Sequence, residues 1–266
     1  MDDWRSYDDV AEIYERVHAH RFAEPARDLV EMAGVAPGGR VLDLGTGTGV
    51  AAEIAAGTLG GWSTVIGVDA SLRMLEVGRR TRPGLRAVAA EAIDLPFPDR
   101  SFDVVLGNFV LAHFTKYQTA LFDVLRVLRP GGRVALTTWA DGPDDLQRAW
   151  REVVDEAVPH EVVDTALADA APWHDRFRNR ASVEEALMDA GLRHVRTEIR
   201  RYRFQYGLDE YLEGLGTWAT GRFVRGMLGP AGYEALLLRA RTLFAERFAD
   251  PLNDFRDVLF AVGTKP

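Results

Sequence analysis

The stretch Val41-Leu42-Asp43-Leu44-Gly45-Thr46-Gly47-Thr48-Gly49 decides the fold of this chain. An apolar strand runs here into a glycine loop that opens a helix at Val50. Glycines let the backbone turn sharply and let a ligand approach without meeting a Cβ atom. The dinucleotide fingerprint G-x-G-x-x-G fits only as a variant ending in Ala52, which disfavours NAD. The triphosphate-loop sequence G-x-x-x-x-G-K-S/T does not occur, which excludes that site.

Short apolar runs alternate with helical patterns around this loop, as in a parallel sheet covered on both faces. Strands are predicted over 40–44, 64–69, 85–90, 102–108 and 133–139, and again over 193–204 and 257–263. Helices are predicted between them over 50–57, 71–80 and 115–128. The fold class is therefore α/β, with a doubly wound, mostly parallel seven-stranded sheet.

Each of the first three strands carries an acidic residue at or near its carboxyl end. Asp43 lies in the first strand, Asp69 ends the second and Glu91 ends the third. Because the carboxyl ends of neighbouring strands line one crevice, the three side chains should converge there. A carboxylate after the second strand suits the two hydroxyls of a ribose. A site with several carboxylates and no loop cation disfavours a diphosphate and favours a cationic ligand.

Composition narrows the class of protein further. The 266 residues carry a net charge of −8, which makes nucleic acid and anionic membranes unfavourable partners. The absence of cysteine excludes disulfides, thiolate metal sites and a cysteine nucleophile. The acidic start does not read as a signal peptide, and the uncharged run 54–68 is too short and glycine-broken for a membrane span. We expect a cytoplasmic protein.

Five ordered segments carry a resemblance to a known family: Val41–Gly49, Gly67–Asp69, Ala90–Phe97, Ser101–Val105 and Leu128–Gly132. Together they resemble the class I S-adenosylmethionine-dependent methyltransferases, nearest to the subgroup of ubiquinone/menaquinone and antibiotic-tailoring small-molecule enzymes. The resemblance implies a Rossmann-like methyltransferase fold with helical lid additions and S-adenosyl-L-methionine as cofactor. It says little about the acceptor.

The resemblance also assigns the glycine loop and its acid. It places Gly45, Gly47 and Gly49 under the methionyl part of the cofactor, with Asp43 near the amino group. An alternative for Asp43 is a structural role as acceptor for the loop amides.

The remaining cofactor-side assignments lie on later strands. Asp69 would hold the ribose, although it or Ser71 could instead cap the next helix. Glu91 and the Ala92 amide would meet the adenine, with Glu91 departing from the usual Asp, and Asn108 would lie near the sulfonium. Four further residues are expected at the cofactor: Tyr14, Thr46, Ala70 and Met74.

The additions to the core define the predicted domains. They are an N-terminal helical lid over 1–34, the cofactor-binding Rossmann-like core over 35–140, a helical substrate-lid insertion over 141–181, and the rest of the core over 182–266 with a helical insertion over 205–255. About half of the chain would thus shape what enters the site.

Histidines are the leading candidates for moving a proton, because the chain lacks cysteine. His113 follows the fourth strand, where the sulfonium methyl should point, and is the first candidate for a catalytic base; the alternative is packing on the next helix. His174 is the second candidate. His18 and His20 point to opposite sides of a helix, so at most one faces the site.

Aromatic residues in the additions are candidates for binding substrate. Tyr7 and Tyr14 are two helical turns apart and share a face, which either docks the helix or lines the site. Trp139 ends the fifth strand beside the expected acceptor pocket, and Trp173 lies in the insertion. The predicted substrate-binding residues are Tyr7, Trp139 and Trp173.

Two charged clusters have simpler explanations than a ligand site. Asp141, Asp144 and Asp145 read as helix-capping residues around Gly142-Pro143, so no metal is predicted. The arginines over 193–203 read as protection of a sheet edge, with an anionic acceptor group as the alternative.

These observations predict a cytoplasmic methyltransferase of secondary metabolism that O-methylates a small aromatic or polyketide-like acceptor. The alternatives are a cyclase or isomerase that binds the cofactor without methyl transfer, C- or N-methylation, and, less favoured, an RNA or protein methyltransferase. The sequence leaves a homodimer open.

Overall fold

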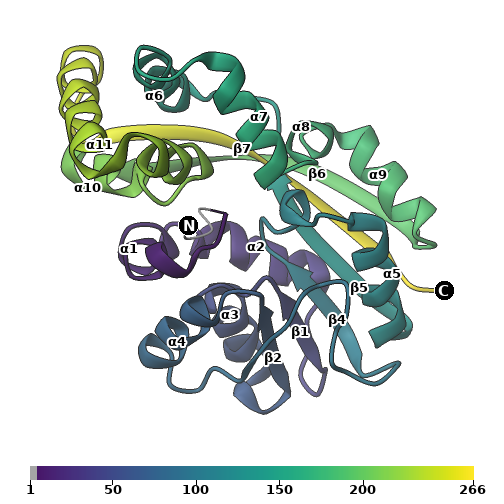
Figure 1. The fold of residues 1–266 in the computed structure, drawn as a ribbon. Coiled ribbons are helices and arrows are strands. Elements are labelled where there is room, and N and C mark those ends of the chain that lie inside the picture. The colour runs from purple at the N-terminus through teal and green to yellow at the C-terminus, as the bar shows by residue number, and fades with distance from the viewer. Residues whose placement is uncertain (1–4) are drawn as a thin grey trace.

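A seven-stranded sheet organises the computed structural model, which describes residues 5–266 (Figure 1). The strand order is β3-β2-β1-β4-β5-β7-β6, with β7 antiparallel to both of its neighbours. The strands are β1 (Val41–Leu44), β2 (Val65–Asp69), β3 (Ala87–Ala89), β4 (Phe102–Gly107), β5 (Leu128–Trp139), β6 (Arg193–Tyr206) and β7 (Leu252–Thr264). The order reverses between β1 and β4, which places a switch point at the glycine loop.

Helices cover both faces of this sheet. One face packs on α2 (Ala23–Ala33) and α3 (Val50–Leu59), and the other on α5 (Tyr117–Val127) and α9 (Arg180–Asp189). The other helices are α1 (Ala11–Tyr14), α4 (Leu72–Thr81), α6 (Asp145–Asp155), α7 (His160–Ala170), α8 (His174–Phe177), α10 (Leu208–Leu215) and α11 (Ala219–Arg247), which breaks at Gly229. The predicted α/β class with a mostly parallel seven-stranded sheet is confirmed.

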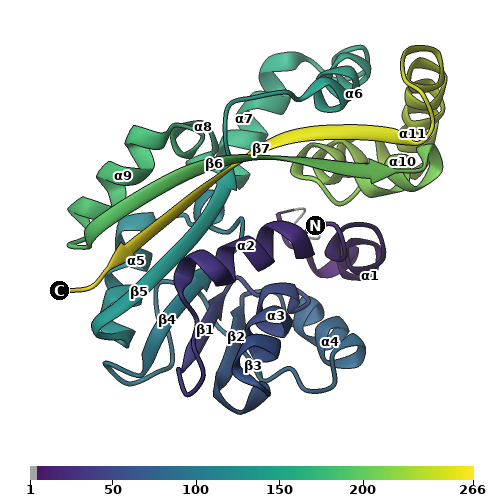
Figure 2. The same cartoon turned by 180° about the vertical axis from the view of Figure 1, so that it is seen from behind.

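The last two strands are longer than predicted. They continue beyond the end of β5 as a hairpin that carries α10 and α11 over the N-terminal helices (Figure 2). The connection between them is therefore shorter than the predicted insertion 205–255, because β6 ends at Tyr206 and β7 begins at Leu252. The sequence pattern of β7 conceals its start, since Asp254 and Arg256 occupy inward positions where apolar residues are usual.

The N-terminal helices lie between the sheet core and the helical insertion. Residues of α1 pack on α4 on one side and on α10 on the other. Arg82 pairs with Glu15 at 2.9 Å, and Arg21 pairs with Glu210 at 2.6 Å, so ion pairs fasten both contacts. The lid predicted over 1–34 is thus held at two surfaces, with residues 1–4 outside the described part of the chain. Among residues 5–266, no helix has the length and apolar character to cross a membrane.

Candidate active site

The glycine loop follows β1 and forms the N-terminus of α3. Gly45, Gly47 and Gly49 all have positive φ, a conformation that glycine adopts without steric cost. A Cβ atom on Gly45 would lie 2.3 Å from Val110 Cγ2, so this glycine is also required by the close approach of the chain after β4. Thr46 donates its backbone N–H to the Val68 carbonyl at 2.9 Å and is buried. The loop is therefore fixed against both neighbouring strands.

Asp43 is buried directly beneath this loop. Its Oδ2 accepts the Thr46 hydroxyl at 2.6 Å and the Ala52 N–H at 3.0 Å, which supports the structural alternative for this residue. Its Oδ1 is buried and has no hydrogen-bond partner among residues 5–266. Burial raises the pKa of Asp43 to about 7. An unpartnered carboxylate oxygen of this kind is suited to a cationic donor from a ligand.

Asp69 connects the end of β2 to the loop. Its Oδ2 accepts the Gly47 N–H and its Oδ1 accepts the Ser71 N–H, both at 2.8 Å. Ser71 caps α4 by accepting the Met74 N–H, so the cap is Ser71 rather than Asp69. Burial raises the pKa of Asp69. The carboxylate remains part-exposed at the carboxyl end of β2, where a ribose is predicted to lie.

The N-terminal segment covers this edge of the sheet. Tyr7 and Tyr14 pack edge to face with ring centroids 6.1 Å apart and join Met74 in one small apolar cluster. Asp8 accepts the Ser71 hydroxyl at 2.5 Å and the Arg73 N–H at 3.2 Å. The two tyrosines therefore share a face, as predicted, and that face lies over α4.

Glu91 and Ala92 follow β3 at the same edge. Glu91 is exposed and Ala92 is half-buried, while Ala70 after β2 is exposed. No side-chain hydrogen bond engages Glu91 within residues 5–266, so its carboxylate is accessible. The adenine contacts of these residues remain predictions.

Asn108 directly follows β4, at the carboxyl end of the strand. Thr137 on the neighbouring β5 donates its hydroxyl to Asn108 Oδ1 at 2.7 Å and accepts the Phe109 N–H at 2.9 Å. Phe109 has a φ of 58°, which is costly for a residue with a side chain. Backbone strain held by surrounding bonds is frequent where a ligand is positioned.

An aromatic cluster begins at Phe109. Its ring centroid lies 4.3 Å from that of Trp139 and 5.2 Å from that of Phe22. Phe22 also contacts Phe204 and Trp218 at 6.0 and 6.4 Å. We call Phe22, Phe109, Trp139, Phe204 and Trp218 the aromatic cluster. It combines one residue of the lid, two at strand ends of the core and two from the hairpin and its insertion, so three distant parts of the chain build it.

The two predicted catalytic histidines lie on two elements that contact each other. His113 ends a short 3-10 helix of the core, Leu111–His113, and His174 begins α8 of the insertion. Surrounding protein lowers the pKa of His113 to about 4, although the side chain keeps an accessible surface. Its ring contacts Tyr7 with centroids 6.1 Å apart. Burial and Arg178 lower the pKa of His174, and both histidines are therefore neutral at pH 7.

His18 is a site candidate that the sequence ranked below the other two. It is buried in the π-helix Glu15–Ala19, and its ring lies 4.8 Å from that of Trp218. The Thr217 hydroxyl lies 2.9 Å from His18 Nε2 and donates to the Gly214 carbonyl at 2.8 Å. Thr217 can then only accept from His18, so Nε2 carries the proton and the unpartnered Nδ1 carries the lone pair.

A model of the methyltransferase domain family matches residues 42–136. The matched range contains the glycine loop, Asp69, Glu91 and Asn108. The chain carries a class I S-adenosylmethionine-dependent methyltransferase domain. S-Adenosylmethionine is the cofactor of this domain.

Curated relatives share this methyltransferase domain. The chain is 40% identical over 114 residues to a demethylmenaquinone methyltransferase of Renibacterium salmoninarum, which is 43% of this chain and 47% of the relative. It is 38% identical over 197 residues to a malonyl-[acyl-carrier protein] O-methyltransferase of Halorhodospira halophila, 70% of this chain and 60% of the relative. The chain spans about half the length of the first curated relatives, from 47% to 58%.

Solved structures share the fold of the methyltransferase domain and its additions. A phosphoethanolamine N-methyltransferase 2 of Haemonchus contortus has a TM-score of 0.56 at 18% identity, covering 98% of this chain and 60% of that one. The [4+2]-cyclase SpnF has a TM-score of 0.53 at 20% identity, covering 92% and 80%. At these identities the likeness shows the fold alone.

Three other residues considered in the sequence analysis contact neighbouring side chains of the protein. Trp173 packs on Tyr117 of α5 with ring centroids 4.7 Å apart. Asp141 pairs with Arg178 at 2.7 Å, and Asp144 pairs with Arg148 at 3.2 Å. In the described part of the chain no group of three His, Asp or Glu residues could hold a metal.

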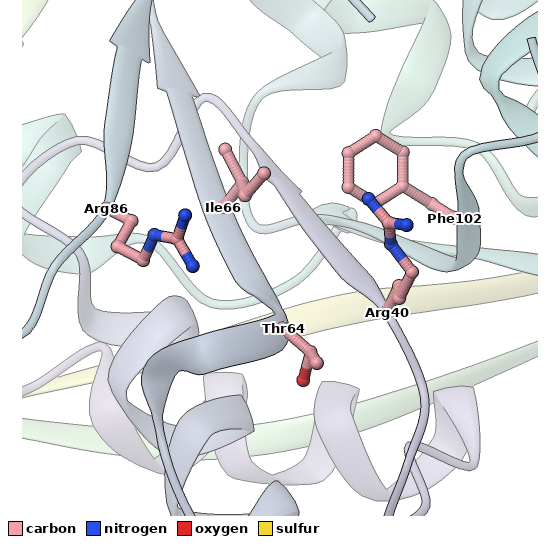
Figure 3. A pocket seen from close by; sticks show the side chains of 5 residues that line it. All are labelled: Arg40, Thr64, Ile66, Arg86 and Phe102. Atoms are coloured by element: carbon pink, nitrogen blue, oxygen red, sulfur yellow. The ribbon is translucent and has the colours of Figure 1, made fainter. Parts of the chain in front are cut away.

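A hollow of about 310 Å³ lies at the other end of the strands (Figure 3). Its lining residues are Arg40, Thr64, Ile66, Arg86 and Phe102. Arg40 and Thr64 immediately precede β1 and β2, and Phe102 begins β4, so this hollow lies at the amino ends of the strands. It is therefore distinct from the methyltransferase site, which lies at their carboxyl ends.

Proposed function

We propose that the protein transfers the methyl group of S-adenosylmethionine to a small aromatic or polyketide-like acceptor, at an oxygen atom. The observation that carries this proposal is the position of the aromatic cluster, which starts at Phe109, directly after Asn108 at the end of β4. Aromatic side chains favour flat apolar ligands through offset and edge contacts.

Several residues of this chain would hold the cofactor. The carboxylates of Asp43 and Asp69 are suited to the amino group and the ribose of the cofactor. The three loop glycines allow the cofactor to approach the backbone of the loop closely. Glu91 would meet the adenine. Tyr14 and Met74 would cover the adenosyl part from the lid and from α4. Bound S-adenosylmethionine supplies a methyl group activated by a cationic sulfur.

The task of the chain is then to orient the acceptor and to exclude water. Orientation alone can contribute about 7–11 kcal/mol to the barrier of such a transfer. Tyr7, Phe22 and Trp218 close the site from the lid and the insertion. His113 would accept the acceptor proton at a ring nitrogen, and its pKa of about 4 makes it a weak base. We therefore assign most of the rate enhancement to positioning.

The relatives support a small acceptor without selecting the atom that is methylated. One relative is named as a C-methyltransferase of ubiquinone and menaquinone biosynthesis. Another is named as a malonyl-[acyl-carrier protein] O-methyltransferase. Transfer to oxygen in secondary metabolism, in the cytoplasm and without nucleic acid or membrane partners, belongs to our proposal, and a homodimer is compatible with it.

Calorimetric titration with S-adenosylhomocysteine tests the cofactor part, and product mass tests the transfer. Incubation with S-adenosylmethionine and a panel of phenols and hydroxyquinones should add one methyl group to an acceptor. A converted product without added mass would instead indicate a cyclase or isomerase. Failure to bind S-adenosylhomocysteine at millimolar concentration would refute the proposal as a whole.

A further inference from the structure

Arg256 is a buried cation at the border of the aromatic cluster. Its guanidinium carbon lies 4.4 Å above the ring centroid of Trp139, and the residue is only 9% exposed. The same Trp139 ring contacts Phe109 at 4.3 Å, so the guanidinium and the residue after Asn108 share one aromatic neighbour. Arg256 therefore belongs to the walls of the proposed acceptor site.

The hydrogen-bonding capacity of Arg256 is unused. Its guanidinium makes no hydrogen bond within residues 5–266, and its one ion pair, to Asp254, is long at 4.0 Å. The unpartnered guanidinium nitrogens are not fully enclosed by protein, so a ligand could reach them. Because a guanidinium has five N–H donors, burying it with so few partners is costly unless a ligand completes the set.

The position of Arg256 on β7 also indicates a ligand-binding role. Leu252, Asp254, Arg256 and Val258 alternate along the inward face of β7. Two charged residues at inward positions of a strand are unfavourable for folding unless they serve a function. The pairing of β5 with β7 ends at Trp139 and Val258, so Arg256 lies just beyond the end of β5.

The electrostatics of this wall favour an anion. A second buried arginine, Arg222, lies over the Tyr7 ring with its guanidinium carbon 4.1 Å from the centroid. The nearby histidines His113 and His174 are neutral at pH 7 and do not compete for a negative group. Asp254 is the opposing charge, 4.0 Å from Arg256. Burial raises its pKa to about 6, so it is still largely ionised at pH 7 and competes with an acceptor carboxylate for the guanidinium.

We propose that Arg256, stacked on Trp139, is the docking point for a carboxylate of the acceptor, which makes the acceptor a small aromatic acid. A planar guanidinium binds a carboxylate with two parallel hydrogen bonds, and its stacking on an indole fixes the plane. The acid group would then set the distance between the acceptor ring and Asn108. This inference rests on the proposed function.

The test compares a carboxylate with its neutral isostere at saturating S-adenosylhomocysteine. 2-Naphthoate and 2-naphthamide serve as probes, with binding measured by calorimetry. The wild-type protein should bind 2-naphthoate at least about tenfold more tightly than 2-naphthamide. Arg256→Met should remove this preference and leave the affinity for S-adenosylhomocysteine unchanged. Arg256→Lys should keep part of the preference, and Asp254→Asn should increase it.

Arg203→Met is the matched control, because Arg203 lies on the exposed side of β6 and bonds to Asn253 at 2.7 Å. It should leave both probe affinities unchanged. Equal binding of the two probes by the wild-type protein overturns the inference without any variant, as does a preserved preference in Arg256→Met. Failure to bind S-adenosylhomocysteine would instead count against the proposed function, so the two failures are distinguishable.

Discussion

The Thr137 hydroxyl donates to Asn108 Oδ1 at 2.7 Å across the β4–β5 pair. The Thr137 hydroxyl oxygen also accepts the Phe109 N–H at 2.9 Å, so one side chain fixes the two residues that follow β4. Thr137 is fully buried, and water cannot replace either bond. The position of the aromatic cluster relative to the cofactor side of the crevice therefore depends on a residue that lines neither.

Replacing Thr137 by Val tests this dependence. The variant keeps the shape of the side chain and leaves the Phe109 N–H unpaired, which should lower the free energy of unfolding by about 1–3 kcal/mol. Methyl transfer should fall more than S-adenosylhomocysteine affinity, since Phe109 contacts the acceptor side. Thr138→Val is the control, because the Thr138 hydroxyl makes no hydrogen bond within the described chain. Equal effects of the two variants would contradict the prediction.

Gly45→Ala should abolish cofactor binding. Alanine at positive φ costs about 1–2 kcal/mol, and its Cβ would also overlap Val110 Cγ2 at 2.3 Å. Gly38→Ala separates the two effects, because Gly38 has a φ of 85° and no atom within 4 Å of a Cβ. Denaturant unfolding should show only the backbone cost for Gly38→Ala. The Val110 Cβ would also lie 2.8 Å from the new Cβ, so Val110→Gly is the change that removes the overlap. If Val110→Gly fails to restore any stability to Gly45→Ala, the overlap is not the cause.

The core of the site could be predicted because it is local. The strand, the glycine loop and Asp69 lie within one short stretch of sequence, and parallel pairing brings their carboxyl ends together. The inner face of β7 could not be predicted, because Asp254 and Arg256 interrupt the apolar alternation that marks a strand. The partner of His18 could not be predicted either, because Thr217 lies 199 residues away.

Asp69→Asn should weaken S-adenosylhomocysteine binding by about tenfold or more. The carboxylate accepts two backbone N–H groups, from Gly47 and Ser71, whereas an amide offers one oxygen. Each lost hydrogen bond to a charged group costs about 1.5–3 kcal/mol. Calorimetry measures the loss, and Asp94→Asn, at an exposed position of the same edge, should bind like the wild type. Comparable losses in both variants would assign the effect to net charge.

His18 should make the protein sensitive to acid. Burial lowers the pKa of His18 from 6.5 to about 4, so the folded chain excludes a proton that the unfolded chain binds. Above pH 6.5 the ring is neutral in both states and costs nothing. As the pH falls from 6.5 toward 4, the unfolded state is favoured progressively, by about 3 kcal/mol in total.

His18→Gln removes this titration and keeps a donor at the position of Nε2 for Thr217. Denaturant unfolding at pH 7 and at pH 4 should therefore show a smaller loss of stability for His18→Gln than for the wild type. His194→Gln, at an exposed position at the start of β6, should keep the wild-type slope. An unchanged slope in His18→Gln would mean that the ring gains its proton in the folded state, and Nδ1 would then be a donor rather than the nitrogen with the lone pair.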